Sequence, residues 1–300
     1  MRDESDTKIP VLDCHAHFLD AQLHTYPIFQ QRSTGFEALV GDYSSLPRRY
    51  LPEQYFKDAE GLNVVGTVCA EFISTDPLRE AQWLDGLCTA QAYAQGVIAV
   101  ADFLDADVES VLSSYRPLRH IKVVRQHLAW HPDNPALRFA TRPDVMRDKL
   151  WREGLALLRK HDLHCEIEVF APQLSDFTAA ASSYPDIQFV LPLMGWPIDL
   201  SEVGHRDWKA SMKTLSRCEN VAVKIFGMEC IFGLRWTLEQ VRPRFLTLLI
   251  SLARTAACLP ATCPSPGSPV VLITSSVPIS KSLLVSALWK SGRSFTIRPH

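Results

Sequence analysis

The chain has 300 residues, of which 47% are hydrophobic and 21% are charged. This composition is typical of a globular protein with one large domain or two small ones, and it excludes a disordered tail, a collagen-like rod and a disulfide-rich miniprotein. The formal net charge of −2 provides no overall attraction for nucleic acid or for an anionic membrane, so we expect neither as a partner.

Short apolar runs alternate with helical patterns along the chain. Continuous apolar runs are typical of parallel strands that are buried on both faces. The predicted strands cover residues 11–14, 64–70, 97–103, 121–124, 164–169, 187–191 and 221–225. The predicted helices cover residues 79–94, 108–115, 143–161, 174–183, 208–216 and 237–249.

This alternation predicts an α/β fold, specifically a (β/α)8 TIM barrel in which the eighth strand-helix unit is not recognisable. No repeat or low-complexity linker divides the chain, so we expect a single domain over residues 1–300. A doubly wound open sheet is the alternative, but no glycine-rich dinucleotide loop follows any strand. In a barrel the catalytic groups gather at the carboxyl ends of the strands, so the residues there are the candidate site residues.

The first predicted strand leads into Asp13-Cys14-His15-Ala16-His17. Two histidines at positions i and i+2 of an extended segment point to the same face, and a divalent metal ion can use that spacing. The alternative is a pair of loop histidines with ordinary hydrogen-bond partners. Cys14 lacks the signature of a nucleophile, and we expect it in the core.

Arg125 and His127 follow the fourth predicted strand and are candidate catalytic residues. A guanidinium can hold a substrate carboxylate or a lactone carbonyl, and a histidine can relay a proton near pH 7. The alternative for Arg125 is an ion pair with a structural acid.

Four further residues are candidates for substrate binding. Glu71 ends the second predicted strand, where a carboxylate can orient a histidine or an arginine or form a structural salt bridge. Lys224 stands in an otherwise apolar predicted strand and faces either the barrel mouth or a helix dipole. Trp130 and Trp196 can form an apolar wall, although aromatic packing explains most such residues.

Short motifs occur in a fixed order between residues 9 and 250. They are VLDCHAHF at 11–18, YP at 26–27, GDY at 41–43, YLP at 50–52, NVVGTV at 63–68, WL at 83–84, IKVVR at 121–125 and NVAVKI at 220–225. On these motifs the chain resembles the amidohydrolase superfamily, in particular its TIM-barrel hydrolases that include sugar-lactone and pyrone-dicarboxylate lactonases.

The resemblance implies an enzyme that hydrolyses a lactone or a similar cyclic ester or amide of a small carboxylated molecule. His15 and His17 match the family's first metal-binding pair, which implies zinc or manganese, although some of these lactonases use a metal-free pocket. A third histidine is expected after the strand that ends near Leu191, where this chain has Leu193. The alternatives are a non-oxidative decarboxylase of the same superfamily and a catalytically inactive remnant. The oligomeric state is left open.

The N-terminus and the cysteines predict a cytoplasmic protein. Residues 1–8 carry acids where a secretory signal has basic residues and an apolar run. The eight cysteines form no Cys-x-x-Cys pair and no zinc-binding spacing, as expected of reduced thiols. No transmembrane helix is expected, because the most apolar late stretch, residues 270–289, is interrupted by Pro278, several serines and Lys281.

Residues 251–300 are atypical of the rest of the chain. Residues 1–239 carry 24 basic and 33 acidic side chains, whereas residues 240–300 carry seven basic side chains and no acid. The family's last catalytic group is an aspartate at the end of strand eight, in a motif like Cys-Met-Phe-Ala-Ser-Asp-x-Pro, and nothing like it occurs as written.

A shifted reading frame supplies the missing motif. When residues 253–267 are back-translated and read one frame over, the degenerate code permits Ala-Asp-Arg-Cys-Met-Phe-Ala-Ser-Asn-Leu-Pro-Ile-Ala-Gly, in which Asp is also permitted after Ser. The same shift over residues 294–300 permits Leu-Phe-His-Asp-Thr-Ala-Ala, which is similar to the family's closing helix. The hypothesis is a frameshift near residues 245–252, and an ordinary basic tail is the alternative.

Overall fold

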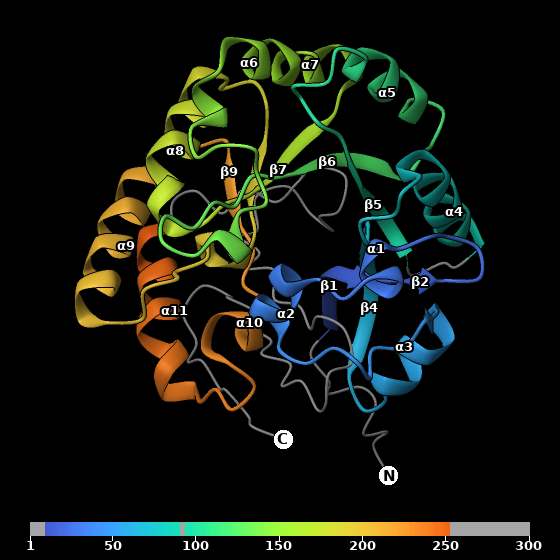
Figure 1. The fold of residues 1–300 in the computed structure, drawn as a ribbon, viewed down its shortest axis with the longest axis horizontal. Coiled ribbons are helices and arrows are strands. Elements are labelled where there is room, and N and C mark those ends of the chain that lie inside the picture. The colour runs from blue at the N-terminus through green and yellow to red at the C-terminus, as the bar shows by residue number, and fades with distance from the viewer. Residues whose placement is uncertain (1–9, 91–93, 253–300) are drawn as a thin grey trace.

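A seven-stranded sheet lies at the centre of the computed structural model, which describes residues 10–90 and 94–252. Every neighbouring pair is parallel and the strands follow one another in chain order. The sheet therefore curls into the wall of a barrel (Figure 1), which confirms the predicted fold class. The strands are β1 (Pro10–His17), β4 (Asn63–Ala70), β5 (Ala94–Val100), β6 (Ile121–His127), β7 (His164–Glu168), β8 (Phe189–Leu191) and β9 (Val221–Val223).

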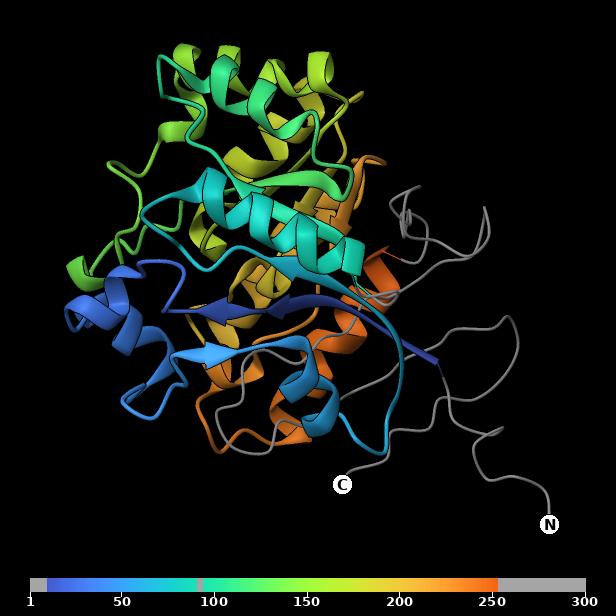
Figure 2. The same ribbon diagram turned by 90° about the vertical axis from the view of Figure 1, so that its right-hand side faces the viewer.

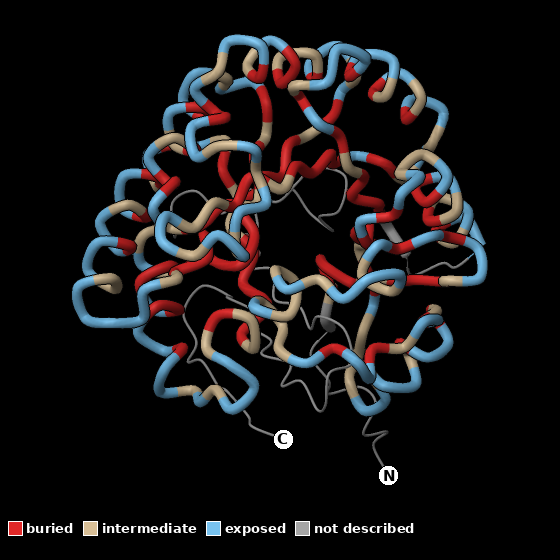
Figure 3. Tube along the Cα trace, in the orientation of Figure 1, coloured by how far each residue is buried: buried red, intermediate tan, exposed pale blue. Residues whose placement is uncertain are grey.

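Helices cover the outside of this wall, and their inward faces are buried (Figure 3). The outer helices are α4 (Pro77–Ala90), α5 (Val108–Tyr115), α6 (Lys149–Ala156), α7 (Leu158–His161), α8 (Leu174–Ser183), α9 (Glu202–Leu215) and α11 (Leu238–Leu252). Smaller elements lie in the connections, namely α1 (Pro27–Gln30), α2 (Thr34–Val40), α3 (Pro52–Asp58), α10 (Met228–Phe232) and the antiparallel pair β2 (Leu19–Asp20) and β3 (Arg49–Tyr50). Single 3-10 turns occupy Pro135–Leu137, Val145–Arg147, Ala171–Gln173 and Leu193–Gly195.

The sheet ends at β1 on one side and at β9 on the other. Within residues 10–90 and 94–252, β1 pairs only with β4 and β9 pairs only with β8. The predicted motif of strand eight and the proposed frameshifted tail fall on residues 253–300, outside the described part of the chain.

Two strands reach further than predicted, and β5, β7 and β9 end earlier, at Val100, Glu168 and Val223. β1 extends to His17 and β6 extends to His127, so the histidines and Arg125 stand inside strands and not after them. The prediction ended these strands too early because polar side chains interrupt the apolar runs there. In the barrel these side chains face the interior, and the strand continues through them. β9 ends at Val223, so the prediction that Lys224 lies within a strand was wrong by one residue.

The predicted helix over residues 143–161 was wrong as a single element. It consists of the 3-10 turn at Val145–Arg147 followed by α6 and α7. Asp148 breaks it, because its backbone is extended and its side chain accepts the N–H of Leu150 at 2.7 Å as an N-cap. Leu150, in the first turn of α6, is 64% exposed.

The barrel core and the direction of the strands determine where a site can form. Cys14 is 2% exposed, as expected of a core residue. β1 points toward the side of the molecule that carries α1 and α2 (Figure 2), so the carboxyl ends of the parallel strands lie on that side.

Among the described helices, none is long and apolar enough to cross a bilayer.

Candidate active site

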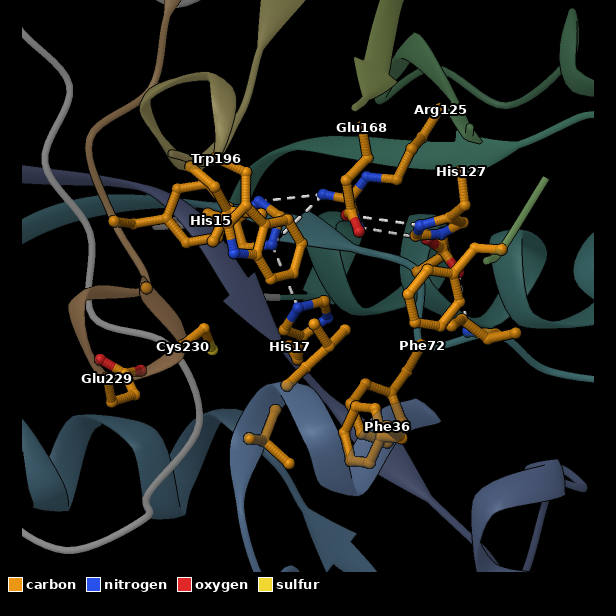
Figure 4. A pocket seen from close by; sticks show the side chains of 18 of the residues that line it. His15, His17, Phe36, Phe72, Arg125, His127, Glu168, Trp196, Glu229 and Cys230 are labelled. Carbon is orange, nitrogen blue, oxygen red and sulfur yellow. Dashed lines mark hydrogen bonds and ion pairs between the residues drawn. The ribbon is translucent and has the colours of Figure 1, made fainter. Parts of the chain in front are cut away.

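A cavity of about 310 Å³ opens at the carboxyl ends of the strands (Figure 4). Its base, which we call the charged floor, consists of His15, His17, Glu71, Arg125, His127 and Glu168. Its sides, which we call the apolar wall, consist of Phe36, Leu39, Val40, Leu46, Phe72, Ile73, Phe139, Leu193, Trp196 and Phe226. Gly227, Glu229 and Cys230 complete the lining. Polar groups at the base of an apolar cavity are the usual arrangement of a small-molecule site.

The two histidines of β1 meet at their Nε2 atoms, which lie 3.1 Å apart. Asp13 holds the segment, because its carboxylate accepts the backbone N–H of His15 at 3.0 Å and the hydroxyl of Tyr55 at 2.7 Å. The Nδ1 of His17 lies 3.2 Å from the carbonyl oxygen of Ala70, so it donates its proton there and leaves Nε2 bare.

The neighbours of His15 determine which of its nitrogens carries the proton. Its Nδ1 lies 3.1 Å from Nη2 of Arg125 and 3.5 Å from Nζ of Lys224, and its Nε2 lies 3.2 Å from the same Nη2. Both cations are donors only; because Arg125 lies near both ring nitrogens and Lys224 contacts Nδ1, we assign the lone pair to Nδ1 and the proton to Nε2, which donates to His17. Burial, together with these two cations, holds the pKa of His15 well below its usual range. Burial, reinforced by Arg125, lowers the pKa of His17 to about 4.

Arg125 is at the centre of a buried charge network and is 3% exposed. Its Nε donates to Glu166 at 2.7 Å and its Nη1 to Glu71 at 3.2 Å. Lys224 lies 2.6 Å from the second oxygen of Glu166. Burial of Glu166 alone would raise its pKa, but Arg125 and Lys224 outweigh that effect and lower it. Arg125 therefore forms the ion pairs with structural acids that were the predicted alternative, and it also lines the cavity.

His127 lies between two carboxylates. Its Nε2 is 2.9 Å from Glu71 and its Nδ1 is 3.3 Å from Glu168. Burial opposes a charge on this ring, but Glu168 and Glu71 outweigh burial and raise the pKa of His127 to about 10. At neutral pH the ring is therefore a cation that donates hydrogen bonds, and the predicted proton relay near pH 7 does not fit this pKa.

Strained backbone surrounds the cavity. Ile73, Leu193, Met194 and Trp196 have φ angles of 54°, 54°, 56° and 37°, which side chains with a Cβ rarely adopt. The Ile73 N–H donates to Glu71 at 2.7 Å, and a 2.8 Å hydrogen bond from Trp208 to the Met194 carbonyl anchors the other turn. Strain of this kind persists where the surrounding contacts hold a functional loop in place.

The structure brings together most of the predicted site residues. His15, His17, Glu71, Arg125, His127 and Trp196 all line the cavity. Lys224 lies behind it, against Glu166. Trp130 is not among the lining side chains; its ring lies under the guanidinium of Arg138 at 4.7 Å. The functional roles of these residues remain predictions.

Sequence reasoning missed Glu166 and Glu168. Both stand in β7, two residues apart, and therefore share the face that looks into the barrel. A signal was present, because two acids at positions i and i+2 of an otherwise buried strand need partners in the interior.

The described residues do not fit a divalent metal ion at the histidine pair. An ion bound by both Nε2 atoms would require the proton of His15 to move to Nδ1, which faces the N–H donors of Arg125 and Lys224. The place of the expected third histidine is taken by Leu193, a buried side chain without a ligating atom. Over residues 10–90 and 94–252, no group of three or more His, Cys, Asp or Glu has the arrangement of a metal site.

A parallel barrel with its titratable groups collected at the carboxyl ends of the strands is the architecture of a TIM-barrel enzyme. Residues 12–254 match the sequence model of the amidohydrolase family. The uncharacterized protein y4mH of Sinorhizobium fredii is 30% identical over 238 residues, which cover 78% of each chain. The chain therefore belongs to the amidohydrolase family of enzymes, as its motifs predicted.

Two solved structures have a similar fold. A zinc-bound amidohydrolase from Burkholderia multivorans has a TM-score of 0.61 and 20% identity, with 81% of both chains covered. A putative 2-pyrone-4,6-dicarboxylic acid hydrolase from Pseudomonas putida has a TM-score of 0.57 and 18% identity, with 80% of this chain and 78% of that chain covered. At these identities the likeness shows the fold alone.

Proposed function

We propose that the protein hydrolyses the ester bond of a lactone or of a related cyclic ester or amide, with a small molecule as its substrate. The observation that carries the proposal is that a proton acceptor and two cations line the same cavity. The unprotonated Nε2 of His17 becomes a proton acceptor when a water molecule takes the place of the His15 N–H beside it, and the cations Arg125 and His127 line the same floor. Hydrolysis of a carbonyl compound needs both kinds of group.

The steps follow from these positions. A water molecule attacks the carbonyl carbon and transfers a proton to Nε2 of His17, while an N–H group of Arg125 and the positive charge of the nearby His127 ring stabilise the negative charge that develops on the carbonyl oxygen. When the tetrahedral intermediate collapses, the ring C–O bond breaks and the leaving oxygen takes the proton from His17. Glu71 and Glu168 keep His127 charged throughout.

Product analysis tests the reaction class. Purified protein incubated with a panel of γ- and δ-lactones should open the ring and release one proton for each bond broken, without carbon dioxide. Release of carbon dioxide from an aromatic carboxylic acid would instead establish the decarboxylase alternative. Failure to convert either class would support the inactive alternative for the chain as written.

The pH profile should identify His17 as the base. We expect kcat/KM for lactone opening to rise as the pH increases through about 4, where His17 loses its proton, and to fall near pH 10, where His127 loses its own. His17→Asn should lower kcat by about 10²–10⁴-fold. The control is His205→Asn on α9, outside the cavity, which should retain the wild-type profile. A full-activity His17→Asn variant would contradict the assignment.

The metal content of the protein should follow from the proton on His15. We expect purified protein to contain far less than one equivalent of zinc or manganese by elemental analysis, and its activity to survive dialysis against a chelator. His15→Ala/His17→Ala should then leave the metal content unchanged. Near-stoichiometric metal that this double variant loses would show that both histidines ligate an ion, and the metal-free mechanism would have to be replaced.

A further inference from the structure

The cations near the charged floor already have carboxylate partners. Arg125 contacts Glu166 and Glu71, and His127 contacts Glu71 and Glu168. Lys224, behind the floor, contacts Glu166. In the described part of the chain, a carboxylate on the substrate would therefore have to displace one of these acids or be buried beside it.

The outer part of the cavity is apolar and is held in place before any ligand binds. α2 contributes Phe36 and Leu39 to the apolar wall. A Cβ on Gly35 would lie 2.6 Å from the carbonyl oxygen of Ala136, so only glycine lets α2 approach the Pro135–Leu137 turn this closely. The Ser33 side chain caps the helix by accepting the N–H of Phe36 at 3.1 Å.

The rim of the apolar wall is open to solvent. Ile73 is 49% exposed and Phe139 is 38% exposed, and both line the cavity. Phe36 and Phe72 extend the aromatic surface toward the charged floor (Figure 4). Apolar surface of this kind at the mouth of a cavity is stabilised when a ligand covers it.

We infer that the substrates are uncharged and carry an apolar group, such as a phenyl ring, that occupies the apolar wall while the cyclic ester reaches the charged floor. This inference rests on the proposed function for the reaction itself, and on the charges and the wall of the cavity for the substrate class. It replaces the carboxylated substrate that the resemblance implied.

Two matched pairs of compounds test the inference. The first pair is γ-phenyl-γ-butyrolactone and its 4-carboxyphenyl analogue, which differ by one carboxylate. The second pair consists of the corresponding cyclic ethers, 2-phenyltetrahydrofuran and its 4-carboxyphenyl analogue, which have no ester to hydrolyse. Turnover is measured with the lactones, and binding is measured by calorimetry with the ethers.

The neutral member should be preferred in both measurements. We expect the neutral ether to bind at least about tenfold more tightly, because the acid must leave water without a free cation to meet it. Preferred binding of the neutral ether without turnover of either lactone would support the substrate class and refute the proposed reaction. Equal or tighter binding of the carboxylated ether would overturn the inference, whichever lactone is opened.

A charge placed on the apolar wall should change this preference. Phe139→Arg supplies a cation at the rim and should reduce the preference for the neutral ether by about tenfold, since a partly desolvated ion pair then becomes available. Leu150→Arg on α6 adds the same charge at a site 64% exposed and outside the cavity, and it should leave the preference unchanged. An unaltered preference in Phe139→Arg would show that the wall does not select the ligand.

Discussion

Replacing Arg125 with methionine should lower the free energy of unfolding by about 3–5 kcal/mol at pH 7. The side chain is 3% exposed, and Glu166, which it neutralises, is fully buried. Methionine fills a similar volume but leaves Glu166 with Lys224 as its one remaining ion-pair partner among the described residues. Urea unfolding monitored by tryptophan fluorescence measures the loss.

The loss should depend on pH. In the wild type, Arg125 and Lys224 outweigh burial and lower the pKa of Glu166. A lowered pKa contributes stability at pH values above the unfolded pKa, and this contribution disappears as the pH falls. Because the variant lacks most of it, the difference between the two proteins should be full at pH 7 and should shrink as the pH falls below the unfolded pKa of about 4.3.

Two further variants separate the network from unspecific effects. Arg125→Met/Glu166→Gln removes both members of the pair and should recover part of the loss, which a double-mutant cycle quantifies. Arg147→Met removes a surface ion pair with Asp176, in which the arginine is 67% exposed, and should change stability by less than about 1 kcal/mol. If Arg125→Met were as mild as Arg147→Met, the buried network would not stabilise the barrel.

Restoring the alternative reading frame near residues 245–252 should produce a more stable and more active protein. In the described part of the chain, β1 and β9 each have one free edge, and a strand between them would pair with both and close the barrel. We expect the melting temperature to rise by at least about 5 °C, since 1 kcal/mol corresponds to roughly 2–4 °C in a chain of this size. Lactone turnover should rise as well, because a strand-eight acid would then lie near His15 and His17.

The chain as written should expose more apolar surface than the restored protein. Ile250, near the end of α11, is 80% exposed, so we expect the written form to bind a hydrophobic dye more strongly. Sequencing the gene around residues 240–265 is the direct test. Codons that do not permit the alternative reading, or equal stability and turnover in the two proteins, would show that residues 253–300 are authentic.

The sequence alone determined the barrel and the direction in which its site opens. Apolar runs such as residues 64–70 predicted parallel strands, because strands buried on both faces need apolar side chains throughout. The spacing of His15 and His17 placed both rings on one face of β1, since a strand alternates with a period of two. Arg125 was assigned to the same end of the barrel on the same reasoning.

The tertiary structure decided which groups act on one another. Glu166 lies 41 residues from Arg125 in the chain, and Lys224 lies 209 residues from His15. Only contacts between such remote segments assign the proton of His15. They also place Glu71 and Glu168 against His127 and pair every cation around the charged floor with a carboxylate. The apolar wall likewise depends on where α2 packs. These properties vary with distance and burial between remote segments, because electrostatic energies change steeply over a few ångströms in a desolvated site.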